Sequence, residues 1–442
     1  MRYLPDGTRM RQADAHTIQE IGIPSVVLME HAALRTVEAM EQEKIDCSRV
    51  LVVCGSGNNG GDGFAAARLL AGKGSAVTVV FAGREASLTP ECRIQMQIVE
   101  NLGIPVVSEL PEGRYTAVVD ALLGVGLSRD VSGAYAELLK KLNELPGAKV
   151  AVDIPSGICS ATGRVLGCAF RADLTVAFQC EKLGTVLYPG REYAGKVIPA
   201  EIGIDTSFYE TIPDICYTLE KSDLSRRLPM RKPDSHKGTY GKALMITGSR
   251  GMAGAAYLSA KAAYTSGAGL VQIYTEESNR AILQQLLPEA IISVYEEYDQ
   301  EQLTSLLRWA DVVCIGCGLG QNRTSESLLK GTLLGCRVPC VVDADGINLL
   351  ACHPELLKEM GYPLILTPHM KEMSGLLGCS VAELRQSRMS RLRAFIQTCP
   401  AVCVLKDSCT IVAQRGKQDF VNTAGNHGMA KAGSGDVLAG VI

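Results

Sequence analysis

The chain has 442 residues, and its 44 Lys and Arg against 47 Asp and Glu give a formal net charge of −3. At roughly 150 residues per domain, this length predicts two or three domains and excludes a single small module. A composition of 47% hydrophobic and 21% charged residues excludes a disordered chain. The balanced charge gives no indication of a polyanionic partner, so we expect no nucleic-acid binding.

The sequence also bears on location and on the cysteines. No apolar stretch reaches the ~18 residues of a membrane span, and the first residues lack the apolar region of a secretory signal. We therefore expect a cytoplasmic protein without a membrane partner. The 16 cysteines are scattered singly, mostly in apolar runs, which indicates reduced, packed thiols. The C-x-x-C pair of Cys314 and Cys317 lacks the second pair of a zinc site, so we predict no metal there.

Short β-branched runs alternate with helical stretches in two series, which is typical of α/β domains with a mainly parallel sheet flanked by helices. The first series predicts strands at Val50–Cys54, Ala76–Phe81, Thr116–Asp120, Lys149–Asp153 and Asp173–Phe178. The second predicts strands at Lys242–Thr247, Leu270–Tyr274, Asp311–Gly316, Pro339–Asp343, Leu364–Pro368 and Val402–Lys406. We also predict a helix over Val381–Thr398 and an irregular connection over 206–235, with the linker near 212–222.

A glycine-rich loop, GSGNNGGDG, joins the first predicted strand to a helical stretch. Such a loop lets backbone N–H groups close on an anion, which the helix dipole also favours. The alternative is a tight turn that needs glycine for positive φ. Five glycines, two asparagines and one aspartate in nine residues exceed what a turn requires. The oxygens of the Asn-Asn pair and of Asp62 also depart from the usual dinucleotide fingerprint and suit a hard cation or a ribose.

Two further strand ends carry oxygen-bearing side chains. Asp120 ends the third predicted strand, Asp153 ends the fourth, and Ser156 follows three residues later. Because parallel strands end at one edge of the sheet, these groups are expected to converge with the glycine-rich loop. Each aspartate alone is equally well a helix cap or an Asx turn. Three such sites in one sheet favour a functional interpretation.

These motifs are similar to those of a known family. CGSGNNGGDGFAAARLL, DALLGVGLSRD, VDIPSG and FQCEKLG resemble the epimerase domain of the NAD(P)H-hydrate repair proteins, over roughly residues 10 to 205. The resemblance implies a Rossmann-like domain that binds potassium. It also implies interconversion of the R and S forms of NADHX and NADPHX, the dinucleotides hydrated at nicotinamide C6.

The resemblance also implies roles for individual residues. Two loops would hold the hydrated dinucleotide, through Asn58, Asn59, Gly60, Gly61, Asp62, Gly124, Val125, Gly126, Leu127, Ser128, Arg129 and Asp130. The implied potassium ligands are Asn59, Asp120 and Ser156. Asp153 would touch the nicotinamide ring and is the predicted acid/base group, because epimerisation at a carbinolamine carbon needs a proton shuttle. Lys182 is a candidate helper, with a solvated surface lysine as the alternative. His31 stands where the family has Asn, and a helix-packing histidine is the simpler interpretation.

The second half ends in GNHGMAKAGSGD, followed by the apolar VLAGVI. A G-S-G-D loop that opens a helix offers amide donors to a phosphoryl group, and Asp436 lies where a general base could take a proton from a hydroxyl. The alternative is a glycine turn with Asp436 as a helix cap. Other polar motifs at predicted strand ends favour catalysis: SHKGTYG, GSRGMAGA, GCGLG, DADGIN, TPH and KDS.

Together these motifs resemble the ribokinase-like ADP- or ATP-dependent NAD(P)H-hydrate dehydratases, from roughly residue 225 onward. The resemblance implies that Asp436 deprotonates the C6 hydroxyl of the S hydrate, which attacks the terminal phosphate; elimination of phosphate then restores NAD(P)H. The implied substrate contacts are Ala255, Gly318, His369 and Asp436, and the implied nucleotide contacts are Lys406, Asp407, Ser408, Cys409, Thr410 and Gly435. Magnesium is expected with the nucleotide, while Asp343 and Asp345 are either structural caps or organise magnesium through water.

Some positions depart from the family pattern. Asp407 replaces a glycine, and a carboxylate beside a phosphate is unfavourable unless it points away or binds a cation. Cys317 and His427 replace prolines, and Ala432 replaces a glycine; we interpret these as tolerated loop variants. The chain ends at Ile442, in the first turns of the helix that the G-S-G-D loop opens. We therefore expect either a truncated chain or an unusually short second domain.

The sequence predicts a bifunctional repair enzyme with an epimerase domain over residues 1–215 and an ADP-dependent dehydratase domain over residues 222–442. Its expected ligands are NADHX or NADPHX with ADP or ATP, and we expect a homo-oligomer. Two alternatives stay open. The second half resembles a ribokinase-like kinase of a vitamin or sugar alcohol, and the first half is compatible with a non-catalytic module for nucleotide binding or partner docking.

Overall fold

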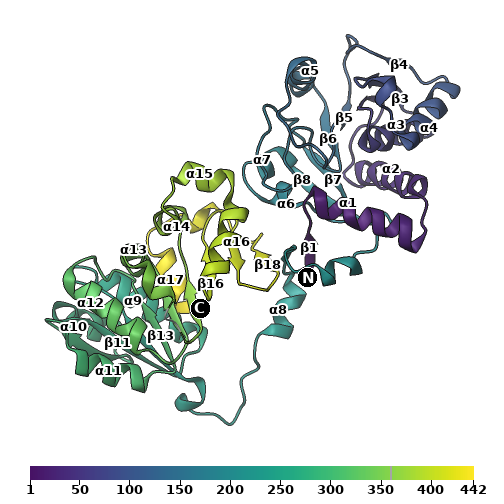
Figure 1. The fold of residues 1–442 in the computed structure, drawn as a ribbon. Helices are drawn as coiled ribbons and strands as arrows, with labels where there is room; N and C mark the ends of the chain where they lie inside the picture. The colour runs from purple at the N-terminus through teal and green to yellow at the C-terminus, as the bar shows by residue number, and fades with distance from the viewer. Residues whose placement is uncertain (359–360) are drawn as a thin grey trace. The chain divides into compact units, whose positions relative to one another are not determined.

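The computed structural model describes residues 1–358 and 361–442. The chain divides into two compact units, Met1–Thr218 and Leu219–Ile442, each with its own sheet and its own buried core (Figure 1). Both units are mainly parallel sheets flanked by helices, so the predicted α/β fold class is confirmed.

The first unit is built on a parallel sheet in the order β4-β3-β2-β5-β6-β7-β8. Its strands are β2 (Arg49–Cys54), β3 (Ala76–Phe81), β4 (Val106–Val107), β5 (Ala117–Ala121), β6 (Ala148–Val152), β7 (Leu174–Phe178) and β8 (Lys196–Ala200). The five strands predicted in this half all form. The sequence did not predict the edge strands, because β4 is only two residues long and β8 carries Pro199, which suits an edge position.

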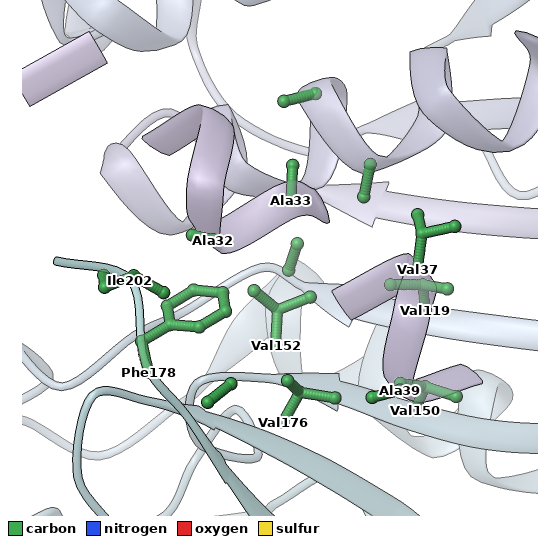
Figure 2. Close-up of a cluster of buried hydrophobic side chains, with 14 of the residues drawn as sticks. Ala32, Ala33, Val37, Ala39, Val119, Val150, Val152, Val176, Phe178 and Ile202 are labelled. Atoms are coloured by element: carbon green, nitrogen blue, oxygen red, sulfur yellow. The ribbon is translucent and has the colours of Figure 1, made fainter. Parts of the chain in front are cut away.

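Alternation along the strands divides the first unit's core between two faces. Val50 and Val52 of β2 belong to the larger cluster, and Leu51 and Val53 belong to a second one with Leu139. The helices that cover the sheet are α1 (Gly7–His16), α2 (Ser25–Gln42), α3 (Asn58–Gly72), α4 (Pro90–Asn101) and α5 (Gly133–Glu144). Figure 2 shows part of the larger cluster, with residues of α2, β5, β6 and β7: Ala32, Ala33, Val37, Val119, Val150, Val152 and Val176.

The second unit has a sheet in the order β18-β17-β16-β15-β14-β13-β10-β11-β12, antiparallel from β16 to β18 and parallel elsewhere. Its strands are β10 (Lys242–Ile246), β11 (Leu270–Glu276), β12 (Ile291–Tyr295), β13 (Val312–Ile315), β14 (Cys340–Val342), β15 (Leu364–Leu366), β16 (Ala401–Leu405), β17 (Ile411–Ala413) and β18 (Asp419–Val421). The six strands predicted in this half form, whereas β12, β17 and β18 were not predicted.

The helices of the second unit include α9 (Ala253–Ser266), α12 (Arg323–Gly335), α14 (Met370–Leu377) and α17 (Ser434–Val441). Ala439 of α17 packs in one core cluster with alanines of α9. A Cβ at Gly440 would lie 2.0 Å from the carbonyl oxygen of Ser259, so the two helices approach closely at this glycine. Among the described helices of both units, none combines the length and the apolar character of a membrane span.

Two predictions of local structure are only partly correct, and the helical pattern over 381–398 fails at a single break. The stretch 381–398 forms two helices, α15 (Val381–Gln386) and α16 (Arg388–Thr398). They are separated at Ser387, whose hydroxyl donates to the carbonyl oxygen of Glu383 (3.0 Å), a local bond that competes with regular helix. The supposedly irregular stretch 206–235 contains the strand β9 (Cys216–Thr218), which pairs with β1 (Arg2–Leu4), and the helix α8 (Lys221–Arg227).

Candidate active sites

The first unit holds a cavity of about 550 Å³, a volume typical of small-molecule sites. Its lining includes residues that follow β2, β5, β6, β7 and β8, so it lies at the carboxyl edge of the sheet, where α1 and α2 also contribute. The predicted site residues that line it are Asn58, Asn59, Asp62, Gly124, Val125, Gly126, Leu127, Ser128, Arg129, Asp153 and Lys182. Gly60, Gly61 and Asp130 lie outside this lining.

The glycine-rich loop brings the backbone of α3 close to its neighbours. A Cβ at Gly60 would lie 1.9 Å from the carbonyl oxygen of Gly55, and one at Gly61 would lie 2.6 Å from Cε of Met29. These glycines are therefore needed for close approach. The first turn of a helix has N–H groups without intrahelical partners, and at this cavity edge they are suited to an anionic ligand.

Asp153 and Lys182 form a buried ion pair at the cavity. The Lys182 ammonium donates to Asp153 Oδ1 and to the carbonyl oxygen of Phe178 (2.7 Å), and the Phe178 N–H donates to the same Asp153 oxygen (2.9 Å). The Lys182 side chain is 0% exposed, so the alternative of a solvated surface lysine is wrong. Asp153 has a φ of 67°, a conformation that costs about 1–3 kcal/mol and that such contacts can hold.

Two further carboxyl groups line the same cavity. Burial and the nearby Asp153 carboxylate raise the pKa of Asp62 well above its ordinary value, although Lys182 acts in the opposite direction. Burial and Asp153 also raise the pKa of Asp14. The cavity thus offers carboxyl groups that retain a proton more readily than usual beside a carboxylate bound to lysine. Carboxyl groups of raised pKa are suited to hold a proton and to return it during acid/base catalysis.

Asp14 and the neighbouring Arg11 reach the cavity because of how α1 is anchored. The Gly7 N–H donates to Ser160 Oγ (3.0 Å), and a Cβ at Gly7 would lie only 2.1 Å from the Val125 carbonyl oxygen. Arg11 and Asp14 were not predicted, because they precede the first predicted strand and belong to no glycine-rich motif. The available signal was the pattern D-G-T at the start of α1, where the Asp6 carboxylate caps the helix.

The three predicted potassium ligands lie near one another. Ser156 Oγ donates to Asp120 Oδ1 (2.7 Å), and the Ser156 N–H donates to Oδ2 (2.8 Å). Ser156 Oγ also accepts from the Leu123 N–H (2.8 Å), next to Gly124, where an added Cβ would lie 3.4 Å from Asn59 Oδ1.

This donor set fits a hard cation. Burial raises the pKa of Asp120 to about 6, even though hydrogen bonds from Ser156 lower it. Within the described part of the chain, the Asp120 carboxylate has no ion-pair partner, and the buried Nδ2 of Asn59 has no hydrogen-bond partner. A buried carboxylate, a hydroxyl and an amide supply the oxygen ligands that such ions prefer.

In the second unit, Asp343 and Lys406 form a second ion pair at a carboxyl sheet edge. Lys406 Nζ lies 2.6 Å from Asp343 Oδ1, and Thr367 Oγ1 donates to that same oxygen (2.6 Å). Asp345 serves a different purpose, since its carboxylate accepts from the Gly320 N–H (2.9 Å) and the Gln321 amide (3.1 Å). The Asp345 carboxylate therefore fixes the end of the GCGLG loop by accepting these two hydrogen bonds.

Asp436 lies in the first turn of α17, next to this ion pair. The cap residue of α17 is Gly433, with a φ of 85°, so the G-S-G-D turn does require a glycine there. A Cβ at Gly435 would lie 3.5 Å from Lys406 Nζ and 3.8 Å from Asp343 Oδ2. Burial and the Asp343 carboxylate raise the pKa of Asp436, while Cys317 and Lys406 lower it. The predicted general base, the lysine and the helix start are thus brought together.

The other predicted substrate contacts surround this point. A Cβ at Gly318, whose φ is 59°, would lie 2.7 Å from the Ala255 Cβ, so these two residues are adjacent. His369 caps α14: its Nδ1 accepts from the Glu372 N–H (3.0 Å), and its own N–H donates to Glu372 Oε2 (2.7 Å). The His369 side chain is 52% exposed, which leaves it open to a ligand while the cap fixes its orientation.

The predicted nucleotide segment, residues 406–410, begins after β16 and turns toward β17. The Asp407 carboxylate accepts a hydrogen bond from the Arg388 guanidinium (3.1 Å), whose side chain is buried. The charge of this unusual residue is therefore neutralised by a cation. Cys409 is fully buried, and Thr410 Oγ1 donates to the Asp407 carbonyl oxygen (3.4 Å), so these contacts shape the turn between the strands.

Comparison with known proteins places these two sites in a family. A model described as YjeF-related protein N-terminus matches residues 25–184, and one described as NAD(P)H-hydrate dehydratase matches residues 243–442. The chain is 36% identical to the bifunctional NAD(P)H-hydrate repair enzyme Nnr of Moorella thermoacetica, over 100% of this chain and 87% of the relative. It belongs to the family of bifunctional NAD(P)H-hydrate repair enzymes.

Two further proteins are similar in sequence to this chain. The enzyme Nnr of Escherichia coli is 35% identical, with 98% of this chain and 83% of the relative covered. A solved ADP/ATP-dependent NAD(P)H-hydrate dehydratase from Bacillus subtilis, co-crystallised with ATP and Mg²⁺, is 31% identical. It covers 48% of this chain and 74% of its own, with a TM-score of 0.41, and the family assignment does not depend on it.

Proposed function

We propose that this chain repairs hydrated NAD(P)H in two steps. The first unit epimerises R- and S-NAD(P)HX, and the second unit dehydrates the S epimer to NAD(P)H with ADP or ATP as the phosphoryl donor. Family membership supports the pair of activities. The observation that carries the proposal is that each unit brings a lysine–aspartate pair and a further carboxyl group of raised pKa to the carboxyl edge of its sheet.

In the first unit, Asp153 serves as the acid/base group of epimerisation. Lys182 and the Phe178 N–H orient its carboxylate toward the cavity, where the glycine-rich loop and residues 124–130 hold the dinucleotide. Asp62 and Asp14 supply carboxyl groups of raised pKa that keep a proton in the same space. A positioned acid/base group contributes typically ~10²–10⁴-fold to a rate.

The oxygens of Asn59, Asp120 and Ser156 would hold potassium beside the loop at residues 122–124. Bound there, the ion supplies positive charge that stabilises the Asp120 carboxylate and the phosphate-binding loops around it. The role of the chain's own residues is to fix those loops, through the hydrogen bonds between Ser156 and Asp120.

In the second unit, Asp436 takes the proton from the C6 hydroxyl of the S hydrate. The hydroxyl oxygen then bonds to the terminal phosphorus as the bond from phosphorus to the leaving nucleotide breaks. Lys406 and the N–H groups at the start of α17 bind the phosphoryl oxygens. Phosphate next leaves with the electrons of the C6–O bond, and loss of a proton from the adjacent ring carbon restores the double bond. Phosphorylation is needed because hydroxide is a poor leaving group.

Ala255, Gly318 and His369 would contact the substrate in this unit, and residues 406–410 with Gly435 would contact the nucleotide. The nucleotide would enter with magnesium, whose charge balances its phosphates. ADP or ATP as the phosphoryl donor, a homo-oligomeric assembly and a cytoplasmic location complete the proposal, as expected from the sequence.

The test is recovery of NADH absorbance from an equimolar mixture of the epimers R- and S-NADHX. With the chain and ADP or ATP, we expect recovery of the whole mixture. Recovery of only the S half would contradict the epimerase assignment. No recovery, together with ADP-dependent phosphorylation of a vitamin or sugar alcohol, would favour the alternative of a small-molecule kinase.

A further inference from the structure

Three side chains of the second unit present their ligand atoms to one point. The Sγ of Cys317 and one carboxylate oxygen each from Asp343 and Asp436 all lie within 4.8 Å of one another. They come from the loop after β13, the position directly after β14 and the first turn of α17. Within residues 1–358 and 361–442, this is the one place where at least three His, Cys, Asp or Glu side chains converge in this way.

We propose that Zn²⁺ binds Cys317, Asp343 and Asp436, and that it inhibits the dehydratase while leaving epimerisation unaffected. The inhibition rests on the proposed function of the second unit, whereas the binding does not. This site is separate from the expected magnesium of the nucleotide, because magnesium selects oxygen ligands and a cysteine sulfur favours zinc.

The geometry of the pair at the base of the site suits zinc. Zn–S bonds of about 2.3 Å and Zn–O bonds of about 2.1 Å, at a tetrahedral angle, place the sulfur and oxygen roughly 3.6 Å apart. Cys317 Sγ lies 3.7 Å from Asp343 Oδ2. The two oxygens of the Asp343 carboxylate have different partners. Lys406 and Thr367 donate to Oδ1, whereas Oδ2 lies on the side of the Cys317 thiol. The half-buried Asp436 would complete the set of protein ligands and leave a fourth position for water.

The charge of the site also favours a divalent cation. With the ion bound, two carboxylates and a thiolate would carry three negative charges, and Lys406 would offset only one of them. Zinc would displace the thiol proton of Cys317 to solvent, with no oxidation of the sulfur. Because the charge of the Asp436 carboxylate would then be taken up by the ion, Asp436 would no longer serve as the base, and the phosphorylation step would stop.

The sequence did not predict this site, because the only metal-binding pattern around it was the pair Cys314 and Cys317. A C-x-x-C pair without a second pair is weak evidence for zinc. In the fold, the further ligand atoms are carboxylate oxygens of Asp343 and Asp436, which lie 26 and 119 positions after Cys317 in the sequence. Such distances do not form a local motif.

Binding is tested on the full-length chain with Cd²⁺, whose bond to a thiolate gives an ultraviolet charge-transfer band. We expect one equivalent of this band to be lost in Cys317→Ser and retained in the matched control Cys352→Ser, which removes an exposed cysteine. Asp436→Asn, at a partly exposed position, should weaken Cd²⁺ binding as well. An unchanged band in both Cys317→Ser and Asp436→Asn would overturn the proposal.

Inhibition is tested by titrating Zn²⁺ against dehydration of S-NADHX and against epimerisation. We expect dehydration alone to be inhibited, reversibly by a chelator, and the zinc concentration for half-inhibition to rise roughly tenfold or more in Cys317→Ser. Equal inhibition of Cys317→Ser and the parent chain would overturn the inhibitory role. If the chain proves inactive as a dehydratase, the Cd²⁺ titration still decides the site, and the inactivity counts against the proposed function alone.

Discussion

The two units carry the same pair of residue types in opposite orientations. In the first unit, the lysine is buried and the aspartate is the more exposed partner, with Lys182 at 0% and Asp153 at 11%. In the second unit, Lys406 is 18% exposed and Asp343 only 2%. The more exposed group of the pair is thus a carboxylate in one unit and an ammonium in the other.

This inversion matches the chemistry proposed for each unit. A proton shuttle needs a carboxylate at the ligand with a cation behind it, whereas phosphoryl transfer needs a cation at the ligand with an anion behind it. Each site adds a carboxyl group in the first turns of a helix that follows a glycine-rich loop: Asp62 in α3 and Asp436 in α17. Two units with similar glycine-rich loops would therefore differ in reaction because a different member of the lysine–aspartate pair is exposed at the site.

The largest effect is expected from Asp436→Asn. Without the carboxylate, no group accepts the C6 hydroxyl proton, so dehydration of S-NADHX should fall by ~10³-fold. Interconversion of the epimers should continue at the parent rate, because Asp436 belongs to the second unit. Dehydration that persists in this variant would show that Asp436 is not the general base. The proposed difference in chemistry between the two units would then be contradicted.

Asp153→Asn is expected to impair the other activity, epimerisation. Epimerisation should fall by ~10²-fold or more, while dehydration of pure S-NADHX is kept. Chromatographic separation of the R and S forms over time measures the first reaction, and NADH absorbance measures the second. Unaffected epimerisation would make the first unit a binding module without catalysis.

Replacing the lysines tests the inversion itself. Lys406→Met should raise the KM for ADP or ATP by roughly tenfold, because it removes a charge that contacts phosphate. Lys182→Met should lower the kcat of epimerisation more than it changes KM, since this lysine only orients Asp153. Lys182→Arg serves as the control for charge. An effect of Lys182→Met on KM alone would show that the lysine touches substrate.

Gly60→Ala tests the close approach at the first glycine-rich loop. A methyl group 1.9 Å from the Gly55 carbonyl oxygen forces the loop to move, which should cost about 1–3 kcal/mol of unfolding free energy. Gly72→Ala is the matched control in the same helix, where the added Cβ meets nothing within 4 Å. Denaturant unfolding compares the two, and equal stability would contradict the tight fit.

The smallest effect concerns pH. Because the folded pKa of Asp62 lies above its ordinary value of 3.8, its contribution to stability is present at low pH and is lost as pH rises through the folded pKa. Asp62→Asn removes this loss, so its thermal midpoint relative to the parent chain should increase from acidic to alkaline pH. A difference that stays constant with pH would mean that Asp62 is not desolvated.

Much of the fold follows from strand and loop patterns, but the exceptions are informative. The central strands were predicted because they are buried runs of valine and isoleucine, whereas β17 and β18 are three-residue strands that exist through pairing with β16. At the sites, carboxylates at strand ends could be predicted from topology. The burial of Lys182 could not, because it depends on contacts with Phe178 and Asp153 made across the sheet edge.

The pairing of Asp407 with Arg388 has a consequence for how such sequences can change. A single return of Asp407 to glycine would leave a buried guanidinium without this carboxylate, which typically destabilises a protein. A single change at Arg388 would instead leave the negative charge of Asp407 without this cation, beside the proposed nucleotide site. Because each side chain balances the charge of the other, we expect Asp407 and Arg388 to be replaced without loss of stability only when both are replaced together.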